Sequence, residues 1–526
     1  MIPDDRMRDA QRIAESGTNE EVNRRISELV DVEHRVVSRR ETIGYMLFDA
    51  NNGFNIDGHK SLFTDSILKI SLDKQALFNG IAGVWDIVDD LIIGGIIERT
   101  RTRWGKFVPY IFAAGFPYAV LATIYWLLPV LFSPEQINNL DYIPKFLAFM
   151  FLEMAMEALN TFKSVAVGGY LSTITPFPSD RRRLLAVSKY FTIIYSRIPD
   201  MIIEFLLDFI TNGIIGGEKD SAELIRLSLM IVGPFTVTVS AAIVTWYSTI
   251  AKERVLQSIE KPKILQSMKI VFTNRPILAY MISNSLGAFG TGVSTNNYYR
   301  WVLFMTTFET IAGIPSFFFQ PIGFSKYNAL AKRFSTKTLY MVSQIFAKLF
   351  YIPIWFYGMF IKGKDGKPFF TNRIAMLPVT AIWEIIYATF WGVRSISQTE
   401  ISNELNDYIE WKYGHRNEAT LSVAGTIFGK IPGRINGILE PMYKKWIGYD
   451  QTAYPEKRPQ PERAQKWIFS MATIITSIVV TVGILPMFAY NIGKTERDKM
   501  YVELNRRRMN TAEAINDAYA REQNNQ

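Results

Sequence analysis

Long apolar stretches recur along the whole chain, and they constrain its fold more than any other feature of the sequence. A helix needs about 20 mostly apolar residues to cross a membrane. Seven stretches meet this requirement clearly: 107–132, 143–171, 184–210, 227–250, 339–361, 374–393 and 468–492. Five weaker ones carry more polar residues: 42–68, 76–97, 271–291, 301–324 and 419–439. We therefore predict an all-α membrane protein with twelve transmembrane helices.

The composition agrees with a membrane protein. Of 526 residues, 48% are hydrophobic, 14% aromatic and only 20% charged, a mixture that favours this class over several soluble domains. The polar residues of the weaker spans are expected to face a water-filled cavity rather than lipid.

Several kinds of chemistry are disfavoured. The chain has no cysteine, which excludes disulfides and thiolate metal sites. Its three histidines are far apart, and no phosphate-binding glycine-rich loop is present. We see no nucleophile beside a base. We therefore expect no enzyme activity, no cofactor and no ATP-driven step.

Basic residues are concentrated in some of the segments between the predicted spans and scarce in others. The formal net charge is +9, and basic residues cluster in the segments 99–106, 181–183 and 252–269, whereas 133–144 contains none. By the positive-inside rule this pattern predicts a multi-pass protein of the cell membrane with both termini in the cytoplasm. We expect the lipid bilayer as a partner and no nucleic acid.

A polar connector at 252–269 divides the predicted spans into six and six. Two six-helix bundles around a site near the membrane midplane are the plan of many secondary transporters. The predicted parts are a cytoplasmic segment 1–41, an amino-terminal bundle 42–251, a middle loop 252–269, a carboxyl-terminal bundle 270–493 and a cytoplasmic tail 494–526. This plan needs no second subunit, so we expect a monomer.

The second predicted span contains three aspartates. In a helix over about 75–97, Asp86 and Asp90 lie four residues apart on one face, with Asp89 alongside. Ionised carboxylates at membrane depth are costly unless they are paired or hydrated. Na⁺, Li⁺ or a proton would neutralise them, and so would Lys430 of the eleventh span, which lies one turn after Thr426. The alternative is a structural charge network or a helix cap.

Two segments then resemble a known family. The motif "WDIVDDLIIGGIIERTRTRWGKFVPY" at 85–110 is similar to the second-span and loop signature of the glycoside-pentoside-hexuronide:cation symporters, the melibiose-permease-like branch of the major facilitator superfamily. The segment "NDYIEWKYGHRNEATLSVAGTIFGK" at 406–430, followed by "IGY" at 447–449, resembles the family's eleventh-span region. The resemblance implies the major facilitator fold and cation-coupled sugar transport by alternating access.

The resemblance also implies roles for single residues. The second-span aspartates and Thr426 match the cation site, which would bind Na⁺ if the protein is Na⁺-coupled. Asp49 in the first span matches an acidic sugar ligand, and Lys189 in the fifth span matches a basic one. Lys430 matches the eleventh-helix lysine, and we place it with the substrate-binding residues.

Departures from the family pattern predict an altered pocket. Ser164 and Gly168 stand where sugar-binding members have an aspartate and an aromatic residue, and Lys163 lies beside them. The first span contains Asp57, His59 and Lys60 where an ordinary member of the family is apolar or aromatic. Ser164 and Lys163 therefore join the predicted substrate-binding residues. An anionic lipid headgroup is the alternative occupant of such a pocket.

The remaining candidates each have two interpretations. Arg101, Arg103 and Lys106 lie in the predicted cytoplasmic loop, where they would gate access by binding acids or helix ends, or would only set topology. Trp391 would stack on a sugar ring, or pack between helices.

Two acidic stripes also have two interpretations: structural ion pairs with Arg197, Lys163 and Lys189, or the wall of a cavity that recognises a charged or polar glycoside. Their members are Asp200, Glu204 and Asp208 in the fifth span, and Glu153 and Glu157 in the fourth.

The sequence thus favours symport of a sugar, glycoside or sugar acid, coupled to Na⁺ or H⁺. One alternative keeps the fold but carries a lysolipid or another amphipathic anion. Another is a membrane sensor that transports nothing.

Overall fold

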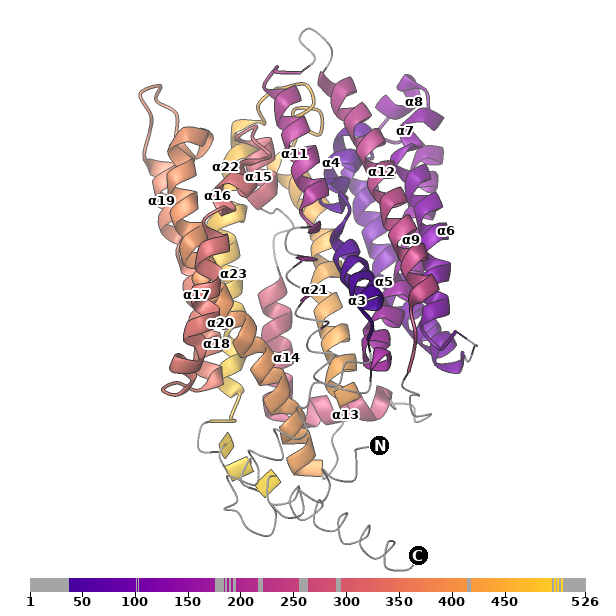
Figure 1. Cartoon of the computed structure of the whole chain (residues 1–526). Coiled ribbons are helices and arrows are strands. Elements are labelled where there is room, and N and C mark those ends of the chain that lie inside the picture. The colour runs from indigo at the N-terminus through magenta and orange to yellow at the C-terminus, as the bar shows by residue number, and fades with distance from the viewer. Residues whose placement is uncertain are drawn as a thin grey trace, which may run out of the picture. The chain divides into compact units, whose positions relative to one another are not determined.

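The computed structural model describes residues 37–175 except 101 and 103, then 184, 187–188, 191–192, 195–215, 221–254, 264–289, 295–413, 418–493, 496–497, 499–500 and 503–504. Helices make up most of these residues, and within these ranges the only β-structure consists of two isolated bridges. The predicted all-α class is confirmed. The described residues form two compact units (Figure 1).

The first unit comprises the described residues of Met1–Leu68, Val84–Ile203 and Arg226–Ile259. Its longer helices, some of which extend beyond these limits, are α3 (Arg39–Ala50), α5 (Leu72–Arg99), α6 (Val108–Trp126), α9 (Ile143–Ile174) and α12 (Ser221–Ile250), and its short ones include α7 (Leu128–Leu131) and α8 (Pro134–Asn138). Helix α11 (Ile198–Thr211) begins in the first unit, and its residues from Glu204 onward belong to the second. Helices α6 and α9 pack along each other (Figure 1).

Aromatic rings fill the core of the first unit. The rings of Phe48 and Tyr247 stack at 4.8 Å, and the hydroxyls of Tyr170 and Tyr247 are hydrogen-bonded at 3.0 Å. These three buried residues come from α3, α9 and α12. Buried tyrosines need a partner for their hydroxyl groups, so this bond fixes how the helices meet.

The first predicted span is not one helix. After α3 the chain passes through η1 (Asn51–Gly53), η2 (Asp57–His59) and α4 (Lys60–Leu62) into a π-helical turn, η3 (Phe63–Ile67). Asn55 explains part of the break, because its side chain accepts a hydrogen bond from the backbone N–H of Asp57 at 3.0 Å and donates to the carbonyl of Asn52 at 3.3 Å. Such local bonds compete with helix formation. Interrupted helices commonly form the substrate sites of transporters.

The second unit comprises the described residues of Lys69–Gly83, Glu204–Ile225 and Glu260–Gln526. Its principal helices are α13 (Ile264–Thr273), α14 (Arg275–Ala288), α15 (Thr295–Trp301), α16 (Phe308–Gly313), α17 (Ser316–Ala331), α18 (Thr336–Leu349), α19 (Tyr351–Phe360), α20 (Arg373–Tyr413), α21 (Glu418–Ile447), α22 (Glu462–Ser470) and α23 (Thr476–Gly483), with short turns η4 (Phe369–Thr371), η5 (Met471–Ile475) and η6 (Leu485–Ala489).

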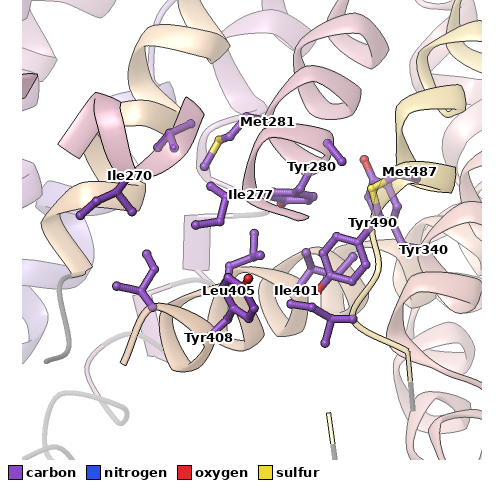
Figure 2. Close-up of a cluster of buried hydrophobic side chains, with 14 of the residues drawn as sticks. Ile270, Ile277, Tyr280, Met281, Tyr340, Ile401, Leu405, Tyr408, Met487 and Tyr490 are labelled. Carbon is purple, nitrogen blue, oxygen red and sulfur yellow. The ribbon is translucent and has the colours of Figure 1, made fainter. Parts of the chain in front are cut away.

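Helix packing in the second unit is centred on α20, which contacts both α17 and α18 (Figure 1). This helix runs about 20 residues past the predicted span 374–393, because its later part is amphipathic and buries Ile401, Leu405 and Tyr408. Those side chains belong to a hydrophobic cluster with Tyr280 and Tyr490 (Figure 2). The predicted span 301–324 was wrong as a single helix, since α15, α16 and α17 divide it.

Five described helical segments are long and apolar enough to cross a membrane: Val108–Trp126, Ser221–Ile250, Thr336–Phe360, Arg373–Tyr413 and Glu462–Ala489. The other predicted spans carry more charge, are broken into shorter helices, or lie partly outside the described residues. The total of twelve and the boundaries of the two bundles therefore stay predictions.

Two glycines allow α17 and α20 to touch. A Cβ atom added to Gly392 would lie 3.1 Å from the Cα of Gly323 and 2.8 Å from the backbone oxygen of Gln320. Small residues at helix crossings permit such close backbone approach in membrane proteins.

We expect Gly392→Ala to lower the free energy of unfolding by about 1–3 kcal/mol, because the helices must separate or strain. Thermal unfolding of the purified protein in detergent measures this. Gly80→Ala is the control, since among the described residues no atom lies within 4 Å of its added Cβ. Equal melting temperatures for the two variants would contradict the close crossing.

Candidate functional site

The break in the first span borders a polar cavity of about 180 Å³ that lies entirely within the first unit. Its walls come from the break itself and from α6, α9 and α12. The polar lining includes Asn51, Lys60, Tyr118, Lys163 and Ser240. Polar groups from several helices around an interrupted one are the usual composition of a transporter binding site.

Lys60 is neutralised within this wall. Its Nζ lies 3.5 Å from Asp57 Oδ1 and 3.8 Å from Glu153 Oε1, and 5.5 Å from the ring centre of Tyr125. The structure thus pairs Glu153 with Lys60 and not with Lys163, its partner in the structural interpretation of the sequence. A partly buried ammonium between two carboxylates is electrostatically satisfied.

Asn51 is fixed at the floor of the break. It is 2% exposed, and its Nδ2 donates to the backbone oxygen of Ser240 at 3.1 Å and to the Ser240 hydroxyl at 2.7 Å. The bond to a carbonyl sets the orientation of the amide, since only the amino group can donate.

Asp49 lies near the end of α3 and accepts a 2.5 Å hydrogen bond from the buried hydroxyl of Ser188. The predicted sugar ligand Lys189 lies outside the described residues. On α9, the exposed Ser164 donates to the carbonyl of Thr161 at 3.1 Å, whereas Lys163 lines the cavity. Of the three predicted residues that the structure describes here, only Lys163 lines the cavity.

The side chains of two of the three second-span aspartates are described, and both are buried. Asp86 is 1% and Asp89 5% exposed on α5, and both interact with neighbouring groups. The side chain of Asp90 lies outside the described part. Among the described residues no three His, Asp or Glu side chains gather as a metal site, and the cation site stays a prediction.

The predicted residues of the carboxyl-terminal half lie in the second unit. Lys430 is partly buried on α21 and interacts with other groups, and the side chain of Thr426 is outside the described part. Trp391 on α20 contacts Phe324 edge to face, with ring centres 6.2 Å apart. This contact accounts for Trp391 as a packing residue, and sugar stacking stays a hypothesis.

Two acids of the predicted fifth span accept hydrogen bonds from α16 and the residues just before it. Asp208 accepts hydrogen bonds from the backbone N–H groups of Thr306 and Thr307 at 2.6 and 2.8 Å. Glu204 accepts one from the Thr310 hydroxyl at 2.8 Å. Neither acid lines the cavity described above.

The end of the predicted gating loop is hydrogen-bonded to Glu253, a residue that the sequence analysis did not predict to be functional. Glu253, after α12, accepts hydrogen bonds from the backbone N–H groups of Lys106, Phe107 and Val108 at 2.9, 2.7 and 3.0 Å. It therefore caps the amino terminus of α6, where the helix dipole favours negative charge. Gly105 has a φ of +109°, and a Cβ there would collide with the Glu253 carboxylate. Arg101 and Arg103 lie outside the described residues.

The next residue, Arg254, joins two more helices. Its guanidinium pairs with Glu41 at 2.6 Å and donates to the carbonyl of Ile174 at 3.1 Å, while its backbone N–H donates to Thr173 at 2.7 Å. Glu253 and Arg254 thus connect the ends of α3, α6 and α9, and we call them the α12 clamp. The only signal in the sequence is an acid–base pair directly after an apolar span.

Comparison with known proteins identifies the family. The family model described as "MFS/sugar transport protein" matches residues 43–494. The chain belongs to this family. It is a multi-pass membrane transporter of the major facilitator superfamily and not an enzyme, and the predicted likeness to the glycoside-pentoside-hexuronide symporters is confirmed.

Similar curated proteins are named for sugars. A putative sulfoquinovose importer of Salmonella typhimurium is 24% identical over 72% of this chain and 75% of its own length. The one of Escherichia coli is 23% identical over 89% and 94%. A lactose permease of Lactobacillus delbrueckii is 22% identical. The match covers 72% of this chain and 56% of the permease.

Solved structures support the fold alone. The xylose transporter XylE from E. coli is similar with a TM-score of 0.52 and 13% identity, over 86% of this chain and 94% of that one. A D-xylose–proton symporter matches with a TM-score of 0.50 and 12% identity, over 86% and 96%.

Glu253→Gln should weaken the α12 clamp, because a charged acceptor facing three N–H groups is replaced by a neutral one. We expect the free energy of unfolding to fall by about 1–3 kcal/mol, measured by thermal unfolding in detergent. The control is Glu135→Gln at an exposed position. A Glu253→Gln melting temperature equal to that of the wild type would refute the capping role.

The pair of Glu41 and Arg254 should make stability depend on pH. Burial alone would raise the pKa of Glu41, but hydrogen bonds from Ser38 and Arg254 outweigh it and lower the pKa. The stabilisation is complete above the unfolded-state pKa of about 4.3 and is lost as the pH falls through the lowered folded-state pKa.

The melting-temperature difference between wild type and Glu41→Gln should therefore shrink between about pH 7 and about pH 3. Glu135→Gln again provides the comparison, with a small difference throughout. A Glu41→Gln difference that stayed constant over this range would show that the ion pair does not stabilise the fold.

Proposed function

We propose that this protein is a symporter that couples the uptake of a sugar or sugar acid to Na⁺ or H⁺. The family match over 43–494 supports sugar transport. The names of its relatives, sulfoquinovose importer and lactose permease, support a sugar or a sulfonated sugar as substrate. Transport by alternating access requires no covalent step.

The observation that carries the coupling proposal is the burial of acids on α5. Asp86 and Asp89 are almost completely buried in a segment that the sequence predicts to lie in the membrane. Such carboxylates are expensive to keep ionised. A bound cation or proton offsets this cost, and we assign that role to Asp86 and Asp90 together with Asp89 and Thr426.

Sugar would bind next to these acids. We assign Asp49, Lys189 and Lys163 to substrate binding in the first unit, where carboxylate and ammonium groups bond to hydroxyls. Lys430, Ser164 and Trp391 are the remaining candidates. Arg101, Arg103 and Lys106 would control access from the cytoplasm, the side on which the charge pattern predicts both termini.

Cation binding would favour the conformation that binds sugar. A ligand shifts a conformational equilibrium only by its difference in affinity between the two states. Cation and sugar that both prefer one conformation therefore bind cooperatively. Return of the empty carrier completes the cycle.

Uptake into proteoliposomes tests this function. We would impose Na⁺ and pH gradients separately and present radiolabelled glycosides and uronides. We expect accumulation of one sugar under one gradient, and loss of that accumulation in Asp86→Asn. The matched control Asp365→Asn changes an exposed loop and should accumulate sugar normally.

Two results would overturn the proposal. If uptake by the Asp86→Asn variant kept its full ion dependence, the cation site would not lie on α5. If the wild-type protein accumulated no sugar under either gradient, it would not be a sugar symporter.

A further inference from the structure

Of the two lysines at the cavity beside the broken first span, Lys163 forms no ion pair with any residue that the structure describes. Lys163, on α9, lines it and is partly buried. Asp57 attracts its ammonium group electrostatically, but Lys163 forms no hydrogen bond or ion pair within the described chain. Lys60, in the same wall, has both Asp57 and Glu153 within 4 Å.

The two lysines therefore differ in what they can still bind. Asp57, which lines the cavity, lies 3.5 Å from Lys60, and Glu153 lies 3.8 Å from it. Glu157 interacts with another group and does not line the cavity. An ammonium group held away from water is costly unless it is paired. An anionic group in the cavity would lower that cost at Lys163.

A second polar atom at the cavity also has no partner. Asn51 Oδ1 is buried and accepts no hydrogen bond from the described residues, while the amide nitrogen is held by Ser240. A buried acceptor left unsatisfied costs about 1–3 kcal/mol. A hydroxyl group in the cavity would donate to it.

The other walls fit a small ring that carries polar groups. Phe54 and Trp126 supply apolar faces, and Tyr118 and Asn160 supply groups that donate and accept hydrogen bonds. The cavity volume of about 180 Å³ is more than ten times the roughly 10–15 Å³ of probe volume that one water molecule needs. This is room for a charged substituent and at least part of one sugar ring.

We infer that this cavity is the recognition site for the acidic substituent of the transported sugar. Lys163 binds a carboxylate or sulfonate on the ring, and Asn51 Oδ1 accepts a hydrogen bond from a neighbouring ring hydroxyl. The inference rests on the proposed sugar transport and makes its substrate class an anionic monosaccharide. It also gives a physical reason why this part of the fourth span has a lysine and lacks the aspartate of sugar-binding family members.

Binding to the purified full-length protein tests the inference by calorimetry. The probes are glucose, glucuronate, and glucose with a sulfonate in place of the 6-hydroxyl group. We expect an acidic sugar to bind at least about tenfold more tightly than glucose, and Lys163→Gln to remove this preference, as for a hydrogen bond to a charged group.

Two further variants separate charge from folding. Lys163→Arg keeps the positive charge and should retain the preference for the acidic sugar. Asn51→Ala should weaken the binding of acidic and neutral sugars alike, since it removes a hydroxyl contact. Lys332→Gln, at an exposed position, is the control and should bind like the wild type.

The outcomes distinguish this inference from the proposed function. Cation-dependent uptake of a neutral sugar without preference for an acidic one would overturn the acidic site and leave sugar symport intact. Acidic-sugar binding unchanged in Lys163→Gln would do the same. Binding of lysophosphatidate but of no sugar, lost in Lys163→Gln, would overturn both.

Discussion

The cost of holding a charged side chain away from water is the constraint on which this structure depends. The buried aspartates of α5 interact with neighbouring groups, and we propose that a cation or proton offsets the rest of their cost. Lys60 is neutralised by two carboxylates. Lys163 forms no ion pair within the described chain that would offset this cost. A transporter gains from such incomplete neutralisation, because the missing charge is supplied by the solute that it carries.

A rigid frame accompanies these polar sites. The α12 clamp holds the ends of three helices with one carboxylate and one guanidinium, and the glycine contact between α17 and α20 holds two helices of the second unit together. The broken segment after α3 is different, since short turns replace regular helix there. Fixed helix ends and an irregular segment at the cavity suit a protein that must keep its binding groups in place while access changes.

Sequence patterns predicted what depends on local composition. Apolar length gave the positions of α6, α9 and α12, and the "TRTRWGKF" motif led to the family. The break at 51–57 was missed because asparagine–backbone bonds are local and weak, while the apolar residues around them continue. Glu253 was missed because it acts on residues 145–147 positions earlier in the chain, a distance at which spacing carries no information.

Thermodynamic linkage between cation and sugar tests the account most directly. Sugar affinity would be measured by calorimetry at constant ionic strength, with Na⁺, with Li⁺, and with neither at several pH values. The account predicts that one of these cations or the proton raises sugar affinity, and that the sugar raises the affinity for that ion by the same factor. A sugar affinity that is the same under all these conditions would contradict it.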